Sequence, residues 1–262
     1  GTIWLPLTHN LGRDTESQIQ TRTSQGSRTV WITRSTDDGV TWSPPAEITP
    51  TTKKSNWTWC ATGPGVGIQL RSGRLVVPCD HVTAENNNRN SHVMYSDDHG
   101  QSWKLGGTAG PQCNESQIAE LSDGSLQFNM RSYHGENRRA IATSKDGGLT
   151  WSEATLDAAL IEPVCQASLL RYPKTPSGDQ SWLLFSNPAG DKREKMTVRL
   201  SRDQGKSWPA ARLLHAGPAA YSCLTVLHDG SIGCLYERGT ESAYERITLE
   251  VFSLEWLRAG AP

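Results

Sequence analysis

The chain has 262 residues, a formal net charge of −1 at pH 7 and a sequence pI of about 6.7. This near-neutral charge gives no electrostatic reason to expect a nucleic acid or an acidic membrane surface as a partner. No apolar run approaches the roughly 20 residues that a membrane-spanning helix needs. Ten tryptophans, 24 glycines and short apolar runs, without a sustained period of 3.6 residues, predict an all-β fold.

Strand pairs are the first predicted elements along the chain. The opening segment, GTIWLPLTHN, has the pattern of the second strand of a hairpin. Complete hairpins, each with a glycine-containing turn between two apolar strands, follow it. They are GIQLRSGRLVVP (67–78), IAELSDGSLQFNM (118–130), SLLRYPKTPSGDQSWLLFSN (168–187) and LTVLHDGSIGCLYE (224–237).

A second motif, Ser-x-Asp-x-Gly-x-Thr/Ser-Trp, alternates with these hairpins, and we call it the Asp-box. It occupies 35–42, 96–103, 144–151 and 201–208. A period of roughly 50 residues is typical of a β-propeller. The aspartate can accept backbone N–H bonds, the glycine supplies a positive φ, and the tryptophan packs beneath the turn. The boxes are therefore predicted to be scaffold turns and not catalytic carboxylates.

Hairpins and boxes together predict units of four antiparallel strands, which are propeller blades. In the third boxed unit the strands are expected near 116–121, 125–131, 139–144 and 151–156. Five units can be counted; the first lacks its first strand and the last lacks a box. We assign 1–262 to one propeller domain.

Blade geometry separates scaffold from function, because the boxes fall on one face of the ring. Strand ends gather side chains from different blades on the other face, near the central axis. Two arginines, several acids, a histidine and a tyrosine are expected there, which predicts an anion site with an acid/base pair. They are Asp80, His81, Glu115, Arg131, Arg193, Tyr221 and Glu237.

The boxes and three further segments resemble the bacterial exo-α-sialidases (neuraminidases) of the six-bladed propeller superfamily, along essentially the whole chain. The segments are NESQIAELSDGSLQFNMR (114–131), NPAGDKREKMTVRLS (187–201) and AYSCLTVLHDGSIGCLYE (220–237). The boxes alone are weakly specific, whereas the spacing of Asn-Glu-Ser to Asn-Met-Arg, with Ala-Tyr-Ser, is specific. The resemblance implies retaining hydrolysis of terminal sialic acid through a tyrosyl–enzyme intermediate.

The resemblance also implies a role for each matching residue. Tyr221 matches the nucleophile and Glu115 the base beside it. Arg131 and Arg193 match the second and third arginines of a triad that binds the sialic acid carboxylate, and Glu237 matches the acid that orients the first. Guanidinium groups bind a carboxylate bidentately. A neutral tyrosine avoids the repulsion that a carboxylate nucleophile would meet, and sialidases are known exceptions among glycosidases for this reason.

Two residues, Asp80 and His81, have a less specific assignment. They lie on the expected face and are predicted to shape the N-acetyl or glycerol pocket; the alternative is that they pack the fold. The family's Arg-Ile-Pro segment and its general acid/base aspartate have no counterpart here, and Asp14 lies past the place where that aspartate belongs. We therefore expect a sixth, N-terminal blade upstream of these residues.

The remaining predictions concern partners, cofactors and location. The expected partners are sialylated oligosaccharides, glycoproteins or glycolipids, with no nucleic acid and no membrane span. No metal or other cofactor is expected, because the six cysteines form no C-x-x-C pair and no zinc-ligand cluster with histidine. They fit the pattern of small buried hydrophobes. A sequon at Asn114 beside the proposed base favours a bacterial source. The predicted location is secreted, periplasmic or cell-surface.

Two other functions remain open on these residues. A trans-sialidase, or an enzyme that forms an intramolecular anhydro product, would use the same side chains. A non-catalytic sialoglycan-binding propeller would keep the anion site without the turnover.

Overall fold

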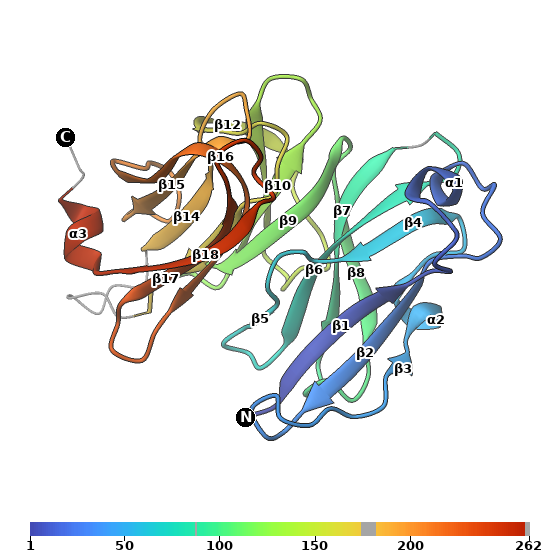
Figure 1. Cartoon of the computed structure of the whole chain (residues 1–262). Helices are drawn as coiled ribbons and strands as arrows, with labels where there is room; N and C mark the ends of the chain where they lie inside the picture. Colours follow the sequence, from blue (N-terminus) through green and yellow to red (C-terminus); the bar gives the residue numbers. More distant parts are fainter. Residues whose placement is uncertain (87, 174–181, 260–262) are drawn as a thin grey trace.

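The computed structural model describes residues 1–86, 88–173 and 182–259 (Figure 1). Within these ranges the chain is almost entirely β, and its strands form four antiparallel sheets in a propeller arrangement. This confirms the all-β propeller prediction. The turn of the third predicted hairpin, at 174–181, lies outside the described ranges.

The N-terminal sheets contain the first two units. The first sheet is ordered β1-β2-β3 and the second β4-β6-β7-β8, with β5 also pairing with β6. Their strands are β1 (Ile3–His9), β2 (Thr29–Ser35), β3 (Ala46–Glu47), β4 (Trp57–Thr62), β5 (Ile68–Gln69), β6 (Leu75–Thr83), β7 (Arg89–Ser96) and β8 (Lys104–Ala109). Among the described residues, β1 forms the edge of the first sheet and pairs with β2.

The C-terminal sheets are ordered β12-β11-β10-β9 and β13-β14-β15-β16-β17-β18. Their strands are β9 (Cys113–Glu120), β10 (Leu126–Ser132), β11 (Arg138–Ser144), β12 (Thr155–Ile161), β13 (Ser168–Arg171), β14 (Leu183–Pro188), β15 (Glu194–Ser201), β16 (Ala210–Val226), β17 (Ile232–Arg238) and β18 (Arg246–Phe252). The long strand β16 pairs first with β15 and then with β17, so it joins the fourth and fifth predicted units into one sheet.

The third boxed unit differs from its prediction in one place. Its last strand, β12, begins at Thr155, four residues later than expected. Trp151 packs against Phe128, with 4.5 Å between ring centroids, and Ser152 donates its N–H to the Thr143 carbonyl at 2.9 Å before the regular pairing of β12 begins. The helices of the described residues are short, and none is long and apolar enough to cross a membrane. They are α1 (Glu16–Gln20), α2 (Thr49–Thr52) and α3 (Leu254–Arg258).

The Asp-boxes have the predicted scaffold role. In the second box, Asp98 accepts the Ser102 N–H at 2.9 Å, Gly100 has a φ of +90°, and Trp103 donates its indole N–H to the Gly100 carbonyl at 3.1 Å. Trp103 is 3% exposed. Because the carboxylate is used within its own turn, we assign the boxes no chemistry.

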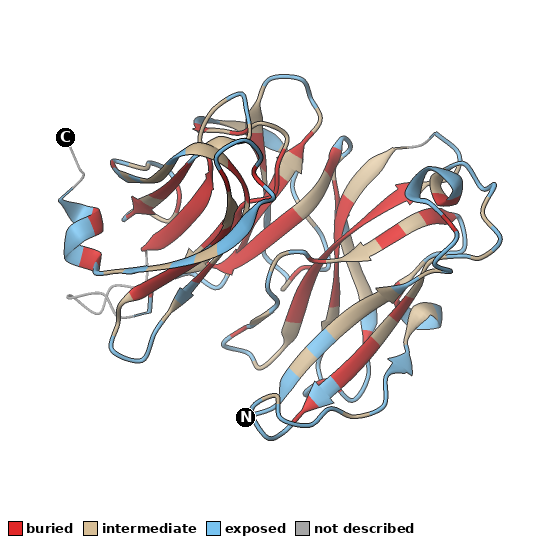
Figure 2. Ribbon diagram, in the orientation of Figure 1, coloured by how far each residue is buried: buried red, intermediate tan, exposed pale blue. Residues whose placement is uncertain are grey.

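Buried hydrophobic residues form clusters between neighbouring sheets and within the six-stranded sheet. Figure 2 shows where the buried residues lie along the strands. Val93 and Phe128, for example, belong to one buried cluster that joins the second and third sheets. Five of the six cysteines are buried, the sixth is half-buried, and all six are free thiols, as the predicted hydrophobic role requires. By contrast, β18 exposes an apolar row of Ile247, Leu249 and Val251.

Candidate active site

Two side chains from two other strands contact the carboxylate of Glu115. Glu115, in β9, accepts a short hydrogen bond from the Tyr221 hydroxyl through Oε1 and an ion pair from Arg131 Nη1 at 2.6 Å through Oε2. Arg131 Nη1 also lies 3.4 Å from the Tyr221 hydroxyl oxygen. Tyr221 belongs to β16 and follows Glu115 by 106 positions in the chain. The structure thus brings together the predicted nucleophile, base and arginine.

The local sequence explains how Arg131 reaches Glu115. The strands β9 and β10 pair regularly up to Met130–Ser116, and the register then shifts before Ser132 pairs with Cys113. An irregularity of this kind redirects a side chain at a strand end. Arg131 therefore lies at the point where the ladder is interrupted, and its guanidinium reaches Glu115.

The charges in this cluster keep the tyrosine neutral. Burial raises the pKa of the Tyr221 hydroxyl, and the adjacent negative charge of Glu115 raises it further. Burial acts against the charge of Arg131, but the attraction and hydrogen bond of Glu115 outweigh it and raise the Arg131 pKa. Tyr221 therefore needs a proton acceptor to become a nucleophile, and Glu115 is in contact with its hydroxyl.

Arg193 approaches the same tyrosine from the connection between β14 and β15. Its guanidinium carbon lies 5.9 Å from the centroid of the Tyr221 ring. Its Nη2 donates to the Val164 carbonyl at 3.2 Å, and its Nη1 makes a short contact with the Tyr244 hydroxyl. The second predicted arginine thus faces the cluster, but its positioning partners were not predicted.

Glu237, at the end of β17, holds the backbone of the tyrosine. Its Oε2 accepts the Tyr221 N–H at 3.0 Å. The resemblance implied that Glu237 orients a different arginine of the triad. The observed contact fixes the main chain of Tyr221, and the role implied by the resemblance stays a prediction.

Asp80 and His81 are consecutive in β6 and point to opposite faces of the sheet, as neighbouring strand residues must. Burial raises the pKa of Asp80 to about 8, the charge of Glu115 raises it too, and Arg28 opposes both. The His81 ring is 2% exposed, stacked on Trp57 at 3.6 Å between centroids, with its Nδ1 3.1 Å from His92 Nδ1. Asp80 itself is 4% exposed, and its role at the site stays a prediction; the position of His81 supports the packing alternative and not substrate binding.

Tyr133 also lies at the rim and was missed from the sequence. Its hydroxyl accepts a hydrogen bond from Asn114 Nδ2 at 3.2 Å, and its ring lies 5.2 Å from the Arg131 guanidinium and 5.0 Å from that of Arg89. Its position two residues after Arg131 is the signal that could have identified it. Among the described residues there is no group of three or more His, Cys, Asp or Glu side chains that could hold a metal ion.

This arrangement defines a chemical class before any comparison. A half-buried tyrosine with a carboxylate at its hydroxyl, flanked by two guanidinium groups, can attack an electrophilic carbon in a substrate that carries an anion. The fold and site are those of an Asp-box propeller with a tyrosine–glutamate pair at its axis.

Comparison with known proteins identifies the family. Residues 1–234 match the BNR repeat-like domain, and the chain belongs to this family. It is 37% identical over 234 residues to a sialidase of Micromonospora viridifaciens. The matched region covers 86% of this chain and 35% of that relative.

Two solved structures have the same arrangement. The Hadza microbial sialidase Hz136 is 35% identical, with a TM-score of 0.86 over 98% of this chain and 51% of that one. The intramolecular trans-sialidase from Ruminococcus gnavus, solved with oseltamivir carboxylate, is 29% identical, with a TM-score of 0.75 over 88% of this chain and 51% of that one. The chain thus spans between a third and about half of these relatives.

Proposed function

We propose that the protein is a retaining exo-α-sialidase, which releases terminal sialic acid from sialylated oligosaccharides, glycoproteins or glycolipids. The observation that carries the proposal is the double contact of Glu115, which accepts from the Tyr221 hydroxyl and pairs with Arg131. The sialidase relatives support the same substrate class.

The proposed mechanism begins with recognition of the substrate carboxylate by Arg131 and Arg193. The Tyr221 oxygen attacks the anomeric carbon while its proton passes to Glu115. The bond from that carbon to the aglycone oxygen breaks, and this oxygen takes a proton from a separate acid. The resemblance implies an aspartate for that acid, and none of the motifs in this chain matches it.

The second half of the reaction reverses the first. Water attacks the anomeric carbon of the tyrosyl intermediate and loses a proton to the conjugate base of the same acid. The phenolate of Tyr221 leaves and recovers its proton from Glu115. Two displacements at one carbon give net retention of configuration.

A Tyr221→Phe variant tests the proposal with a fluorogenic sialoside and the full-length protein. We expect kcat to fall by up to about 10⁶-fold, the scale for loss of a catalytic nucleophile, because phenylalanine has no oxygen that can attack the anomeric carbon. The matched control is Tyr236→Phe, because Tyr236 also donates to a glutamate, Glu250, at 2.5 Å, and lies in the core. Full turnover by the Tyr221→Phe protein would refute the assignment.

A transferase is the second candidate, and the similarity to the R. gnavus intramolecular trans-sialidase favours it. It differs from the hydrolase only in what attacks the tyrosyl intermediate. NMR of the products separates the two, because a hydrolase yields free sialic acid and an intramolecular transferase yields an anhydro sugar. Binding of the sialoside without any product would instead favour a non-catalytic glycan-binding propeller.

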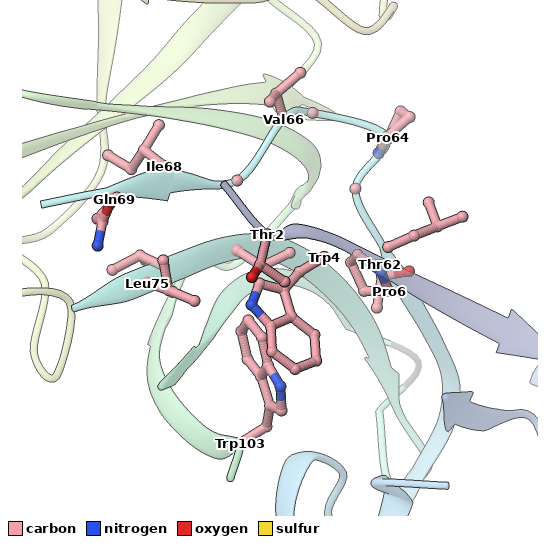
Figure 3. A pocket seen from close by; sticks show the side chains of 16 residues that line it. Thr2, Trp4, Pro6, Thr62, Pro64, Val66, Ile68, Gln69, Leu75 and Trp103 are labelled. Atoms are coloured by element: carbon pink, nitrogen blue, oxygen red, sulfur yellow. The ribbon is translucent and has the colours of Figure 1, made fainter. Parts of the chain in front are cut away.

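A closed ring of six blades remains part of the proposal, and two exposed surfaces support it. One is the apolar row of Ile247, Leu249 and Val251 on β18, with exposures of 71%, 60% and 53%. The other is a cavity of about 400 Å³ between β1 and the second sheet, lined by Trp4, Trp103 and other apolar residues (Figure 3). A further sheet between β18 and β1 would cover the row and pair with the open edge of β1.

A further inference from the structure

A second arginine–glutamate pair is buried behind the site. Arg139, in β11, is 0% exposed and Glu162, after β12, is 1% exposed at its side chain. Arg139 Nη1 lies 2.8 Å from Glu162 Oε2. Arg139 Nε donates to Asn129 Oδ1 at 2.6 Å and Nη2 to the Asn129 carbonyl at 3.2 Å. The pair makes no contact with the Tyr221 hydroxyl, so the proposed chemistry does not use it.

The buried carboxylate holds the backbone next to both site arginines. Glu162 Oε1 accepts the N–H of Ser132, the neighbour of Arg131, at 2.7 Å. Its Oε2 accepts the Cys165 N–H at 3.2 Å, and Arg139 Nη1 donates to the Cys165 carbonyl at 2.8 Å. The pair thus fixes Ser132 where the β9–β10 ladder is interrupted, and the segment 162–165 beside it.

Val164 lies inside that held segment and has a φ of +51°. A β-branched residue rarely adopts this conformation, and it persists only where the surroundings impose it. The carbonyl of Val164 is the one that accepts from Arg193 Nη2 at 3.2 Å. The hydrogen bonds to Cys165 therefore hold the strained residue that orients Arg193.

We propose that Arg139 and Glu162 are positioning residues that set Arg131 and Arg193 for the same carboxylate. The inference rests on the proposed function, since it assigns these arginines to one substrate anion. An apolar pair of similar volume could fill the space, but it could not bond the N–H of Ser132 and both backbone groups of Cys165. Burial alone therefore does not explain the choice of residues.

The test is Glu162→Gln in the full-length protein, which keeps the shape and removes the charge. We expect KM for a fluorogenic sialoside to rise and kcat/KM to fall by about 10²-fold, the effect of misplacing binding groups by about 1 Å. The ratio of the affinities for free sialic acid and its neutral methyl ester should also fall. This ratio measures how well the guanidinium groups bind the carboxylate charge, which the ester lacks. Glu120→Gln is the control, since Glu120 pairs with Arg71 at 3.3 Å at the far end of β9.

A crystal structure of the variant completes the test without needing turnover. We expect the Arg193–Val164 hydrogen bond to be lost. If Glu162→Gln does not fold, Glu162→Asp, which keeps the charge but is one methylene shorter, should show the same rise in KM. A folded variant with unchanged acid preference and unchanged positions of Arg131 and Arg193 would overturn the inference. Absence of sialoside turnover in the wild type would refute only the proposed function, because the crystal structure still decides the positioning.

Discussion

The arginines of the two arginine–glutamate pairs differ in how many of their hydrogen-bond donors have a protein acceptor. Arg139 directs Nε, Nη1 and Nη2 to protein acceptors, and the pair is 0% and 1% exposed. In the Arg131–Glu115 pair the side chains are 14% and 15% exposed, and Arg131 Nε has no hydrogen-bond partner among the described residues. A guanidinium whose donors all have protein acceptors stabilises the fold. A guanidinium with an unbonded donor, in a pair that is partly open to solvent, can donate to a ligand.

The same contrast separates the glutamates. Glu162 bonds an arginine and two backbone N–H groups, all of them fixed in the folded protein. Glu115 bonds the Tyr221 hydroxyl, whose proton it can take, as well as Arg131. The first carboxylate therefore supports structure, and the second is available for proton transfer.

Among the changes to the two arginine–glutamate pairs, removing the Glu115 charge should have the largest effect on activity. In Glu115→Gln the Tyr221 hydroxyl loses its proton acceptor, so kcat should fall by about 10²–10⁴-fold. The free energy of unfolding should change little, because the amide keeps the size and an acceptor oxygen. Steady-state kinetics with a sialoside and urea unfolding measure the two quantities. A variant with normal kcat would show that another group takes the proton.

Breaking the buried pair should lower the free energy of unfolding more than it lowers kcat. Arg139→Met leaves the Glu162 charge without its partner and should lower the free energy of unfolding by about 3–5 kcal/mol, as for other broken buried pairs. Arg131→Met should cost less, since Glu115 can be hydrated. The double variant Arg139→Met/Glu162→Leu should recover only part of this stability, because the N–H groups of Ser132 and Cys165 lose their acceptor, and it should keep a raised KM. If the double variant recovers a normal KM as well, the pair serves stability alone.

A third buried carboxylate, Asp80, sharpens the comparison through pH. Its pKa is raised to about 8 in the folded protein by burial, with a further contribution from Glu115. In the unfolded chain an aspartate titrates near 3.9. The folded state therefore holds the extra proton between these values, and stability should fall as pH rises from about 4 to about 8, by at most about 1.4 kcal/mol per pH unit.

Asp80→Asn removes this dependence. Urea unfolding at pH 5 and pH 8 should show a smaller decrease in stability for the variant than for the wild type, with the variant the more stable protein at pH 8. Equal pH dependence in the two proteins would mean that Asp80 is ionised in the fold.

The sequence predicted what repeats or matches a motif, and it missed what depends on distant contacts. The boxes, the hairpins and the convergence of Glu115, Arg131 and Tyr221 were all predicted. The contact of Arg193 with Tyr244 joins residues 51 positions apart, and no local pattern marks it. Strand alternation, in contrast, could have shown that Asp80 and His81 cannot both face the site.

The buried pair illustrates the same limit. Arg139 and Glu162 look like ordinary charged residues of a strand end and a loop, and only the packing of β10, β11 and the segment after β12 buries them together. A secreted, periplasmic or cell-surface location in a bacterium remains a prediction.

Trapping of the covalent intermediate tests the role of Tyr221 most directly. The full-length protein would be incubated with a sialosyl fluoride that carries a second fluorine beside the anomeric carbon, which slows hydrolysis of the intermediate, and then digested for mass spectrometry. We expect one sialyl adduct, on the Tyr221 oxygen, and none in Tyr221→Phe. An adduct on another residue would contradict the assignment of Tyr221 as nucleophile. Slow turnover of the fluorinated substrate without any adduct on the protein would contradict it as well.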